Sequence, residues 1–399
     1  MVSRRIVYLW DADYPWDVRT EKTCAALTHA GHAVHIVARN RQQRPVLEQL
    51  PEATVHRMPP WRWAGRLDGA LGFPAFFNPR WRRLLDRTVR DVRADLIIVR
   101  DLPLCPAAIA CGRRHGIPVM LDMAEHYPAI MRELWTSNRH RPIDYLVRNP
   151  RAVERVERYC LTHADHILTV AEESSARLVA EGVAPERLTV VRNTPSRTRV
   201  APPRATATPR ATVDVVYLGL LEVSRGILEL LEAAVLLRDR APAVRIVLIG
   251  GGRDETLFHE RARAMGLTDA QVLFHGHVPY ERAMAMVADA DIGALPIHVN
   301  EHMNTTIPNK LFDYMSVGLP VITTDSIPSA RVVRETGCGE VIPPKDARAL
   351  ADAIQRLSDP EDRRARGEAG RQAVIEEYNW ERDTAQLLQA VTVTRTDVQ

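Results

Sequence analysis

The sequence predicts an α/β protein with two domains, each built on a doubly wound parallel sheet. Short apolar segments typical of buried parallel strands alternate with segments of helical periodicity along most of the chain. The alternation is interrupted at residues 196–211, which are rich in proline, arginine, threonine and alanine and show no periodicity. At 399 residues the chain is also too long for one hydrophobic core. We therefore expect domains at 1–200 and 201–375, followed by a closing segment at 376–399.

The first half opens with a β–α–β unit. We expect residues 6–10 to form a strand, 19–30 a helix that ends at Gly31, and 34–38 the next strand. The loop between the first strand and the helix lacks the G-x-G-x-x-G pattern of dinucleotide-binding proteins. Arg19, at the start of the helix, is a candidate contact for an anion, and an ordinary surface position is the alternative.

Residues 57–93 combine tryptophan, phenylalanine and arginine. Aromatic and cationic side chains together suit the headgroup layer of an anionic membrane surface. The same mixture fits a helix that packs its aromatic side chains inward and keeps its arginines outside. It can also bind nucleic acid by stacking and phosphate contacts, but we expect no nucleic-acid partner. The membrane and the packed-helix interpretations both stay open at this point.

Two polar residues follow a strand in the middle of the first half. Strands are expected at 95–100, 118–122 and 164–170, and helices at 104–115, 151–162 and 172–181. Glu125 and His126 come just after the second of these strands. In an open α/β sheet, ligands bind beyond the carboxyl ends of the strands. A carboxylate and an imidazole there can move a proton or orient a substrate, so both are candidate site residues.

The second half repeats the alternation. Its elements are expected as strands at 213–218, 244–249, 272–274 and 292–295, and as helices at 227–238, 255–266, 280–289, 347–357 and 361–391, with a bend near Trp380. The first strand ends at Gly219, and Arg225 stands at the start of the next helix, where it is a second candidate phosphate contact. The second strand runs into Gly250 and Gly251, where glycine lets a backbone approach a ligand closely.

Residues 304–324 are expected to form a loop, a short helix, a tight turn and a buried strand. Pro308 suits the first position of the helix, since its missing N–H costs nothing there. Thr305 and Thr306 stand just before it as possible caps. Gly318 is placed to end the helix in a left-handed conformation.

The polar residues of this short helix predict an anion site. Asn309 and Lys310 occupy its first turn, where the helix dipole and the free N–H groups favour an anion. Asp313 follows one turn later on the same face. Lysine is rare in this chain, since only residues 22, 310 and 345 of the 53 basic residues are lysine. A lysine followed by a carboxylate at this place can hold a diphosphate beside a hydroxylated ring such as ribose.

Composition limits the function classes. The chain carries a net charge of +3, with 31 basic against 22 acidic residues in 1–200, which favours an anionic partner for that half. No uncharged run approaches the roughly 20 residues of a membrane helix, and we expect a cytoplasmic protein without a cleavable signal. The 5 scattered cysteines suit a reducing compartment. His298 and His302 lie four residues apart, but no further ligands cluster near them in the sequence, so no metal site is predicted.

The order of these segments resembles the family-4 retaining glycosyltransferases of the GT-B fold, in which two Rossmann-like domains face each other across a cleft. The most specific stretch is 308–322, Pro-Asn-Lys-Leu-Phe-Asp-Tyr-Met-Ser-Val-Gly-Leu-Pro-Val-Ile. Supporting stretches are Tyr217-Leu-Gly, Ser224-Arg-Gly-Ile, Val247-Leu-Ile-Gly-Gly-Gly and Ala290-Asp-Ile-Gly-Ala-Leu-Pro. The resemblance also implies that the closing helix, which contains Trp380, crosses back onto the first domain.

The resemblance implies transfer of a sugar from a nucleotide diphosphate sugar to a hydroxyl acceptor, with no cofactor and no required metal. Arg225 and Lys310 would contact the donor diphosphate, together with Gly219, Gly250, Gly251, Thr305, Thr306 and Asn309 around the donor. Asp313 would bind the ribose hydroxyls. Glu125 or His126 would meet the sugar and the acceptor, which is a lipid-linked or other glycan acceptor of unknown identity.

The chain departs from the family pattern at three places. The acid expected eight residues before Asp313 is Thr305, so Glu301 or His302 would have to contact the sugar instead. Leu220 and Leu221 stand where a second basic residue often occurs. The glycine-rich first loop is missing. These departures keep open a catalytically weak glycosyltransferase-like partner protein, and a nucleotide-sugar epimerase stays open because it can share the same fold. A nicotinamide dehydrogenase fits poorly, because neither half has the G-x-G-x-x-G pattern.

Overall fold

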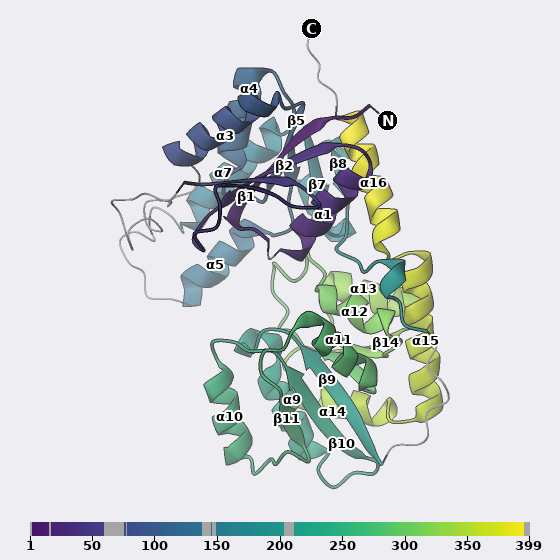
Figure 1. The fold of residues 1–399 in the computed structure, drawn as a ribbon. Coiled ribbons are helices and arrows are strands. Elements are labelled where there is room, and N and C mark those ends of the chain that lie inside the picture. Colours follow the sequence, from purple (N-terminus) through teal and green to yellow (C-terminus); the bar gives the residue numbers. More distant parts are fainter. Residues whose placement is uncertain are drawn as a thin grey trace. The chain divides into compact units, whose positions relative to one another are not determined.

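The computed structural model describes residues 2–15, 17–59, 76, 78–137, 145, 149–202 and 211–394. The chain divides into two compact units (Figure 1). Unit 1 holds residues 1–192 and 383–399, and unit 2 holds residues 193–382. The expected linker lies at the start of unit 2, and its residues 203–210 fall outside the described part of the chain. Residues 60–75 and 77, which make up much of the segment rich in tryptophan and arginine, also fall outside it.

Unit 1 is built, within its described residues, on an eight-stranded sheet with the order β3-β4-β2-β1-β5-β6-β7-β8. Neighbouring strands pair in parallel, except for the antiparallel pair β3 and β4. The strands are β1 (Arg5–Asp13), β2 (Ala33–Arg39), β3 (Leu47–Gln49), β4 (Thr54–Arg57), β5 (Leu96–Arg100), β6 (Val119–Asp122), β7 (His166–Thr169) and β8 (Leu188–Val190). The helices are α1 (Val18–His29), α3 (Pro79–Val92), α4 (Cys105–His115), α5 (Tyr127–Ser137), α7 (Pro150–His163) and α8 (Glu172–Ala180).

The core of unit 1 follows the two-residue period of its strands. Val7 and Leu9 of β1 join a buried cluster with Trp81 and Leu85 of α3, to which α4 and α7 also contribute. Figure 1 shows these three helices gathered beside the sheet. Tyr8, between Val7 and Leu9, is directed to the opposite face, where α1 lies against β2. Each face of the sheet is therefore covered by helices, as expected for a doubly wound arrangement.

Unit 2 has a six-stranded, fully parallel sheet in its described residues, with the order β11-β10-β9-β12-β13-β14. The strands are β9 (Thr212–Leu218), β10 (Ala243–Ile249), β11 (Val272–Phe274), β12 (Ile292–Leu295), β13 (Val321–Thr324) and β14 (Gly339–Ile342). The helices are α9 (Ile227–Leu236), α10 (Glu255–Ala264), α11 (Tyr280–Asp289), α12 (Asn309–Ser316), α13 (Ile327–Thr336), α14 (Ala347–Arg356), α15 (Pro360–Glu376) and α16 (Trp380–Val393), which continues into unit 1.

Both sheets have a point where the strand order reverses. The point lies between β1 and β5 in unit 1, and between β9 and β12 in unit 2. Loops that leave neighbouring strands at such a point turn to opposite faces, which opens a crevice at the carboxyl ends of the strands. The candidate residues of each unit therefore have to be sought at these strand ends.

Most predicted elements are present with bounds shifted by only a few residues. The structure adds β3, β4, β8, β14 and α13, which the sequence analysis did not anticipate. The position of Pro308 also differs from the prediction, because it is the N-cap and α12 begins at Asn309. Gly318 has φ +71° just after α12, so the predicted left-handed end of that helix is confirmed.

Candidate functional site

The glycines expected near a diphosphate lie where β9 and β10 end. The Gly219 N–H donates to the Ile249 carbonyl at 3.0 Å, and the Leu221 N–H donates to the Gly251 carbonyl at 3.1 Å. A Cβ atom on Gly250 would lie 1.9 Å from the Gly219 carbonyl oxygen, and Gly250 has φ +134°. Glycine is therefore required at Gly250 by the close approach of two backbones. The result is an edge of unit 2 that is lined by main chain.

Arg225 is the last residue of a 3-10 turn, η5 (Val223–Arg225), just before α9. The His298 N–H donates to the Ser224 carbonyl at 2.9 Å, which ties this turn to the loop after β12. Gly226 makes the contact possible, since it has φ +76° and its added Cβ would lie 1.9 Å from the Pro296 carbonyl oxygen. The buried Nε of Arg225 has no hydrogen-bond partner among the residues that the structure describes. An oxygen of an anionic ligand would satisfy this donor.

Lys310 and Asp313 meet one turn apart on α12, so their predicted neighbourhood is confirmed. The Lys310 Nζ lies 3.2 Å from the Asp313 Oδ2, and the Tyr280 hydroxyl donates to the Asp313 Oδ1 at 3.3 Å. The Tyr280 ring centroid lies 5.4 Å from the Arg199 guanidinium carbon and 5.8 Å from the Lys310 Nζ. Burial, and then the Asp313 carboxylate, raise the pKa of Tyr280 to about 12. The ring thus stays neutral and holds two cations beside one carboxylate.

The first turn of α12 has no side-chain cap. Thr305 is a possible cap from the sequence, but it does not cap the helix. Its hydroxyl donates to the His302 carbonyl at 2.9 Å and closes a turn in its own loop. The N-cap is Pro308, whose side chain has no acceptor, and Thr306 does not serve as a cap either. Asn309 is exposed at the first helical position. The amide end of this helix, with Lys310 in its first turn, has the charge and the donors of an anion site.

The loop before α12 is fixed by its own side chains. The Asn300 Oδ1 accepts from the Met303 N–H at 2.7 Å, and the Asn304 Oδ1 accepts from the Ile327 N–H at 3.1 Å. Glu301 is exposed in this loop and His302 is partly buried. The His302 carbonyl accepts from the Thr305 hydroxyl. Thr305, which stands where the family has an acid, therefore lies in the same turn as His302, one of the two residues considered in its place.

His298, once weighed with His302 as a metal pair, has a protein partner. Its Nε2 lies 2.8 Å from the Glu229 Oε1 of α9. This contact links α9 to the loop after β12, next to the turn that carries Arg225. His298 therefore supports the position of that turn.

Arg19 is buried in unit 1, so the surface position considered for it is wrong, and its guanidinium is paired within the protein. Its side chain is 3% exposed, its Nη2 lies 2.5 Å from the Asp122 Oδ1, and its Nη1 donates to the Val191 carbonyl at 2.7 Å. Tyr8 donates to the other Asp122 oxygen at 2.7 Å. Burial alone would raise the pKa of Asp122, but Arg19 and Arg100 outweigh it and lower that pKa. The guanidinium of Arg19 thus forms a buried ion pair with the carboxylate of Asp122.

Asp101, which the sequence analysis missed, organises the end of β5. It is 2% exposed and has φ +60°, and its Oδ1 accepts from the N–H groups of Ala124 at 2.9 Å and Glu125 at 3.3 Å. Burial raises the pKa of Asp101 to about 7, with Glu125 and Asp122 adding to the shift and Arg100, 3.4 Å away, opposing it. A buried carboxylate in strained backbone at a strand end is a pattern common at functional sites.

Glu125 and His126 lie between β6 and α5, as predicted. The His126 carbonyl accepts from the Ile130 N–H at 3.1 Å, so this residue directly precedes α5 and accepts a hydrogen bond from its first turn. The His126 side chain is buried, and Glu125 is partly buried. Asp101 fixes the main chain of this loop, which gives the two side chains a defined place at the strand ends of unit 1.

The structure also shows why some of these residues were missed. An aspartate directly after the apolar run 96–100 is visible in the sequence, and the strand-end rule would have found Asp101. Tyr280 and Arg199 give no such signal. Tyr280 reaches Asp313 across 33 positions, and Arg199 falls in the segment that was predicted to be a linker.

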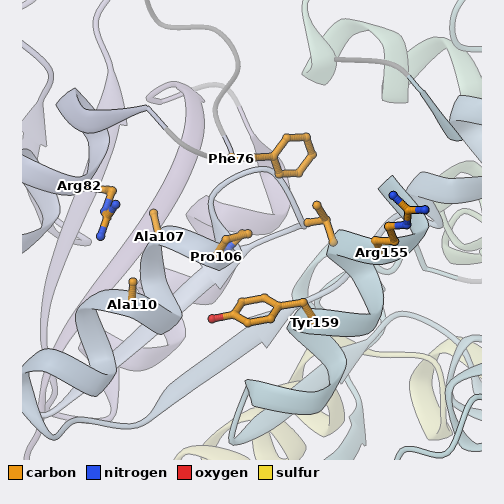
Figure 2. A pocket seen from close by; sticks show the side chains of 8 residues that line it. Phe76, Arg82, Pro106, Ala107, Ala110, Arg155 and Tyr159 are labelled. Carbon is orange, nitrogen blue, oxygen red and sulfur yellow. The ribbon is translucent and has the colours of Figure 1, made fainter. Parts of the chain in front are cut away.

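A cavity of about 360 Å³ lies in unit 1. It lies among α3, α4 and α7 and is lined by Phe76, Arg82, Pro106, Ala107, Ala110, Arg155, Val156 and Tyr159. Figure 2 shows the rings of Phe76 and Tyr159 on either side of Pro106, with Arg82 and Arg155 toward the two ends. The lining is therefore apolar and aromatic with arginine at its margins. No helix in the described part of the chain is long and apolar enough to cross a membrane.

Two family models match the chain, one in each half. A glycosyl transferase 4-like domain matches residues 17–194, and a model of the glycosyl transferases group 1 matches residues 212–359. The chain belongs to the family-4 glycosyltransferases of the GT-B fold. It is therefore an enzyme that transfers a glycosyl group, and the two parallel-sheet units are the two α/β domains of that fold.

Relatives and solved structures agree with this assignment. The chain is 24% identical over 299 residues to a glycogen synthase of Mycobacterium tuberculosis, covering 74% of this chain and 67% of that protein. It is 28% identical over 187 residues to a phosphatidyl-myo-inositol mannosyltransferase of Mycobacterium leprae, covering 47% of this chain and 48% of that one.

Among solved structures, a sucrose-phosphate synthase of Thermosynechococcus elongatus has a TM-score of 0.76 at 19% identity, with 98% of each chain covered. Anabaena HepE in complex with UDP-glucose has a TM-score of 0.71 at 14% identity, covering 98% of this chain and 99% of that one. At these identities the likeness shows the fold alone.

Proposed function

We propose that this glycosyltransferase moves a sugar from a nucleotide diphosphate sugar to a hydroxyl acceptor with retention of the anomeric configuration. The observation that carries the donor part is the cluster of Lys310, Asp313 and Tyr280 at the uncapped start of α12. It joins a cation, a carboxylate and free helix N–H groups, which match a diphosphate beside a ribose. Retention rests on the family resemblance.

The diphosphate leaves with a growing negative charge when the bond to the sugar breaks. Lys310 has three N–H donors and uses one on Asp313, so others can reach phosphate oxygens while the pair persists. Arg225 offers its buried Nε from the turn before α9. Preorganised cations of this kind stabilise developing charge and would take the role of a metal ion, so we propose that transfer needs no metal or other cofactor.

In unit 1 we assign His126 and Glu125 to the sugar and the acceptor hydroxyl. Their support is the fixed loop at the end of β6, which Asp101 holds through two main-chain N–H groups. Replacing His126 by Ala should reduce transfer more than it reduces nucleotide binding. Equal loss of both would instead show that His126 supports the fold.

The donor proposal is tested by thermal shift with UDP, GDP, ADP, dTDP and CMP and their sugars, with NAD and NADP as controls. A ligand at about 100 times its Kd adds about 2.7 kcal/mol to the folded state, which is easily measured. The complex of Anabaena HepE makes UDP-glucose the first donor to try. We expect a shift with one diphosphate nucleotide that is reduced in Lys310→Ala. No shift with any of them would overturn the donor assignment.

Analysis of the reaction products separates transfer from epimerisation. A transferase with its donor should give free nucleotide diphosphate only when a sugar acceptor or water takes the sugar, and the sugar itself should keep its configuration. Conversion of one nucleotide sugar into its epimer without any acceptor would contradict the proposal.

We further propose that the acceptor is carried by a lipid and that the enzyme docks on the cytoplasmic face of an anionic membrane. The support is the apolar cavity with Arg82 and Arg155 at its margins, and the excess of basic residues in 1–200. The name of the mannosyltransferase relative, which acts on a phosphatidyl lipid, points the same way.

Flotation with vesicles tests the membrane part. We expect binding to vesicles with anionic lipid and little binding to neutral ones, and we expect Arg82→Ala together with Arg155→Ala to weaken it. The double variant Arg253→Ala with Arg334→Ala, which removes two basic residues of unit 2, is the matched control. Equal recovery of the protein with neutral and anionic vesicles would rule out anionic docking.

A further inference from the structure

Three metal-ligating side chains meet in unit 1, outside the residues assigned to glycosyl transfer. They are Asp86 of α3, and Cys111 and His115 of α4. Their ligand atoms all lie within 4.8 Å of one another. Cys111 and His115 are four residues apart, so they stand on one face of α4, directed toward α3. Asp86 belongs to another helix, so spacing along the sequence does not join it to the other two.

The charges of this cluster leave two ligand atoms directed at each other. The Oδ2 of Asp86 forms an ion pair with Arg114, while its Oδ1 lies 3.5 Å from the His115 Nε2. Both the Oδ1 and the Nε2 are buried atoms without a hydrogen-bond partner among the described residues. An imidazole that carries its proton on Nε2 would face the carboxylate oxygen across 3.5 Å, which is long for a hydrogen bond, and one protonated on Nδ1 would present a lone pair to it. A cation between the two atoms would satisfy both.

The distances suit a small tetrahedral ion. Zinc bonds of about 2.3 Å to sulfur and about 2.0–2.2 Å to nitrogen and oxygen place the ligand atoms about 3.4–3.6 Å apart. The Asp86–His115 separation of 3.5 Å already has this length. Cys111 would close the third side with a small side-chain rotation, because the largest separation in the cluster is below 4.8 Å.

The types of ligand atom indicate which metal ion is favoured. One thiolate, one imidazole and one carboxylate form a mixed sulfur, nitrogen and oxygen set that favours Zn²⁺ over Mg²⁺ and Ca²⁺. The side chains of Asp86 and His115 are 23% and 24% exposed, so the cluster lies close to the surface, and a water molecule would have to supply the fourth ligand. Arg114, bound to the second oxygen of Asp86, orients that carboxylate as outer partners of metal ligands do.

We propose that Asp86, Cys111 and His115 bind one Zn²⁺ ion that clamps α3 to α4. Both helices line the cavity of unit 1, and the ligands are close to it in sequence. Arg82 lies one turn before Asp86, and Ala110 directly precedes Cys111. The ion thus holds two walls of the cavity together and has a structural role, separate from the residues assigned to glycosyl transfer.

The test uses the untagged full-length chain, first stripped with a chelator and then dialysed against Zn²⁺. We expect about one zinc per chain, competition with a chromogenic chelator, and a rise in Tm with Zn²⁺ that Mg²⁺ does not give. With Co²⁺ in place of zinc, thiolate-to-cobalt charge-transfer absorption should appear. Outer-sphere changes alone cost 10–100-fold in metal affinity, so loss of a ligand in Cys111→Ser or His115→Gln should cost at least about 100-fold.

The matched control is Cys338→Ser, which changes another buried cysteine, in unit 2. It should keep the zinc affinity and the cobalt absorption of the wild type. If Cys111→Ser does not fold, His115→Gln and Asp86→Asn change partly exposed side chains and carry the test. Absence of zinc from the wild-type chain, or unchanged affinity in His115→Gln and Asp86→Asn, would overturn the proposal.

Discussion

Lys310 is the residue on which the donor site depends most. It combines the start of α12 with the Asp313 carboxylate and the Tyr280 ring, and its charge is placed to meet the departing diphosphate. Lys310→Ala should lower the rate of transfer by roughly 10- to 1,000-fold, as the loss of one charge-stabilising donor does elsewhere. Initial rates at saturating donor measure this.

The control for Lys310 is Lys345→Ala, which removes an exposed lysine of unit 2. Its rate should equal that of the wild type. Lys310→Arg keeps the charge but replaces a compact ammonium by a planar fork, so we expect it to recover part of the rate. Equal rates for wild type and Lys310→Ala would show that this side chain does not touch the diphosphate.

Asp101 predicts a dependence of stability on pH. Its pKa of about 7 in the folded chain lies above the ordinary value of 3.8, so the folded state binds one more proton than the unfolded state between about pH 4 and 7. The contribution of Asp101 to stability is thus present at low pH and is lost as the pH rises through 7. Asn at this place keeps the acceptor for the Ala124 N–H and tolerates φ +60°.

Urea unfolding at pH 5 and pH 8 tests this expectation. The free energy of unfolding should fall more steeply with pH for the wild type than for Asp101→Asn. The stability difference between the two proteins should therefore shift in favour of the variant at pH 8. Parallel behaviour of the two proteins across this range would show that Asp101 stays ionised in the fold.

At the scale of single residues, the sequence predicts what lies within one helical turn. The Lys310–Asp313 pair follows from a spacing of three, and the structure confirms it. Arg19 and Asp122 are separated by 103 positions, and only the packing of α1 on the sheet reveals that they form a buried pair. Tyr280 is hidden for the same reason, because its partner Asp313 belongs to another helix.

At the scale of elements, glycine decides how η5 is placed. Gly226 has φ +76°, and an added Cβ would lie 1.9 Å from a carbonyl oxygen of the loop after β12. Gly276 has φ +64° with nothing within 4 Å of such a Cβ. Alanine at either place meets left-handed strain of about 1–2 kcal/mol, but only at Gly226 does it also meet the backbone.

Thermal and urea unfolding of the two alanine variants separates strain from collision. Gly276→Ala should lose about 1–2 kcal/mol, and Gly226→Ala roughly 3 kcal/mol or more, with weaker nucleotide binding because Arg225 moves with the turn. Equal losses of stability in the two variants, with nucleotide binding intact in both, would mean that the loop after β12 moves aside for the added Cβ without an energetic cost.

Helices and strands with strong periodicity are predicted well, and weak ones are not. Strands β5, β6, β9 and β10 are largely buried apolar runs that can be recognised in the sequence. Strand β3 has three residues, Leu-Glu-Gln, and exists because it pairs with β4 at the edge of the sheet. Proline suits the first turn of a helix, which predicts Pro308 inside α12, yet the helix begins only after it.

At the scale of the whole molecule, each unit has a core of its own, and the last helix belongs to both. α16 starts in unit 2, while its residues from Asp383 onward belong to unit 1. There the Arg192 N–H donates to the Asp383 Oδ1 at 3.1 Å, and the Arg4 Nη1 donates to the Thr394 carbonyl at 2.7 Å. The sequence resemblance suggested a returning helix, but these contacts come only from the structure.

Leu387 is fully buried in this part of α16, whereas Val393 is 55% exposed. Leu387→Ala should therefore destabilise unit 1 by about 2–5 kcal/mol, and Val393→Ala should change its stability by less than about 0.5 kcal/mol. Because the donor residues all lie in unit 2, the nucleotide should still raise the Tm of that unit in both variants. Calorimetry with and without the nucleotide assigns each transition. If Leu387→Ala lowered the nucleotide-sensitive transition instead, the two cores would unfold as one cooperative system, and the donor site would depend on the packing of unit 1.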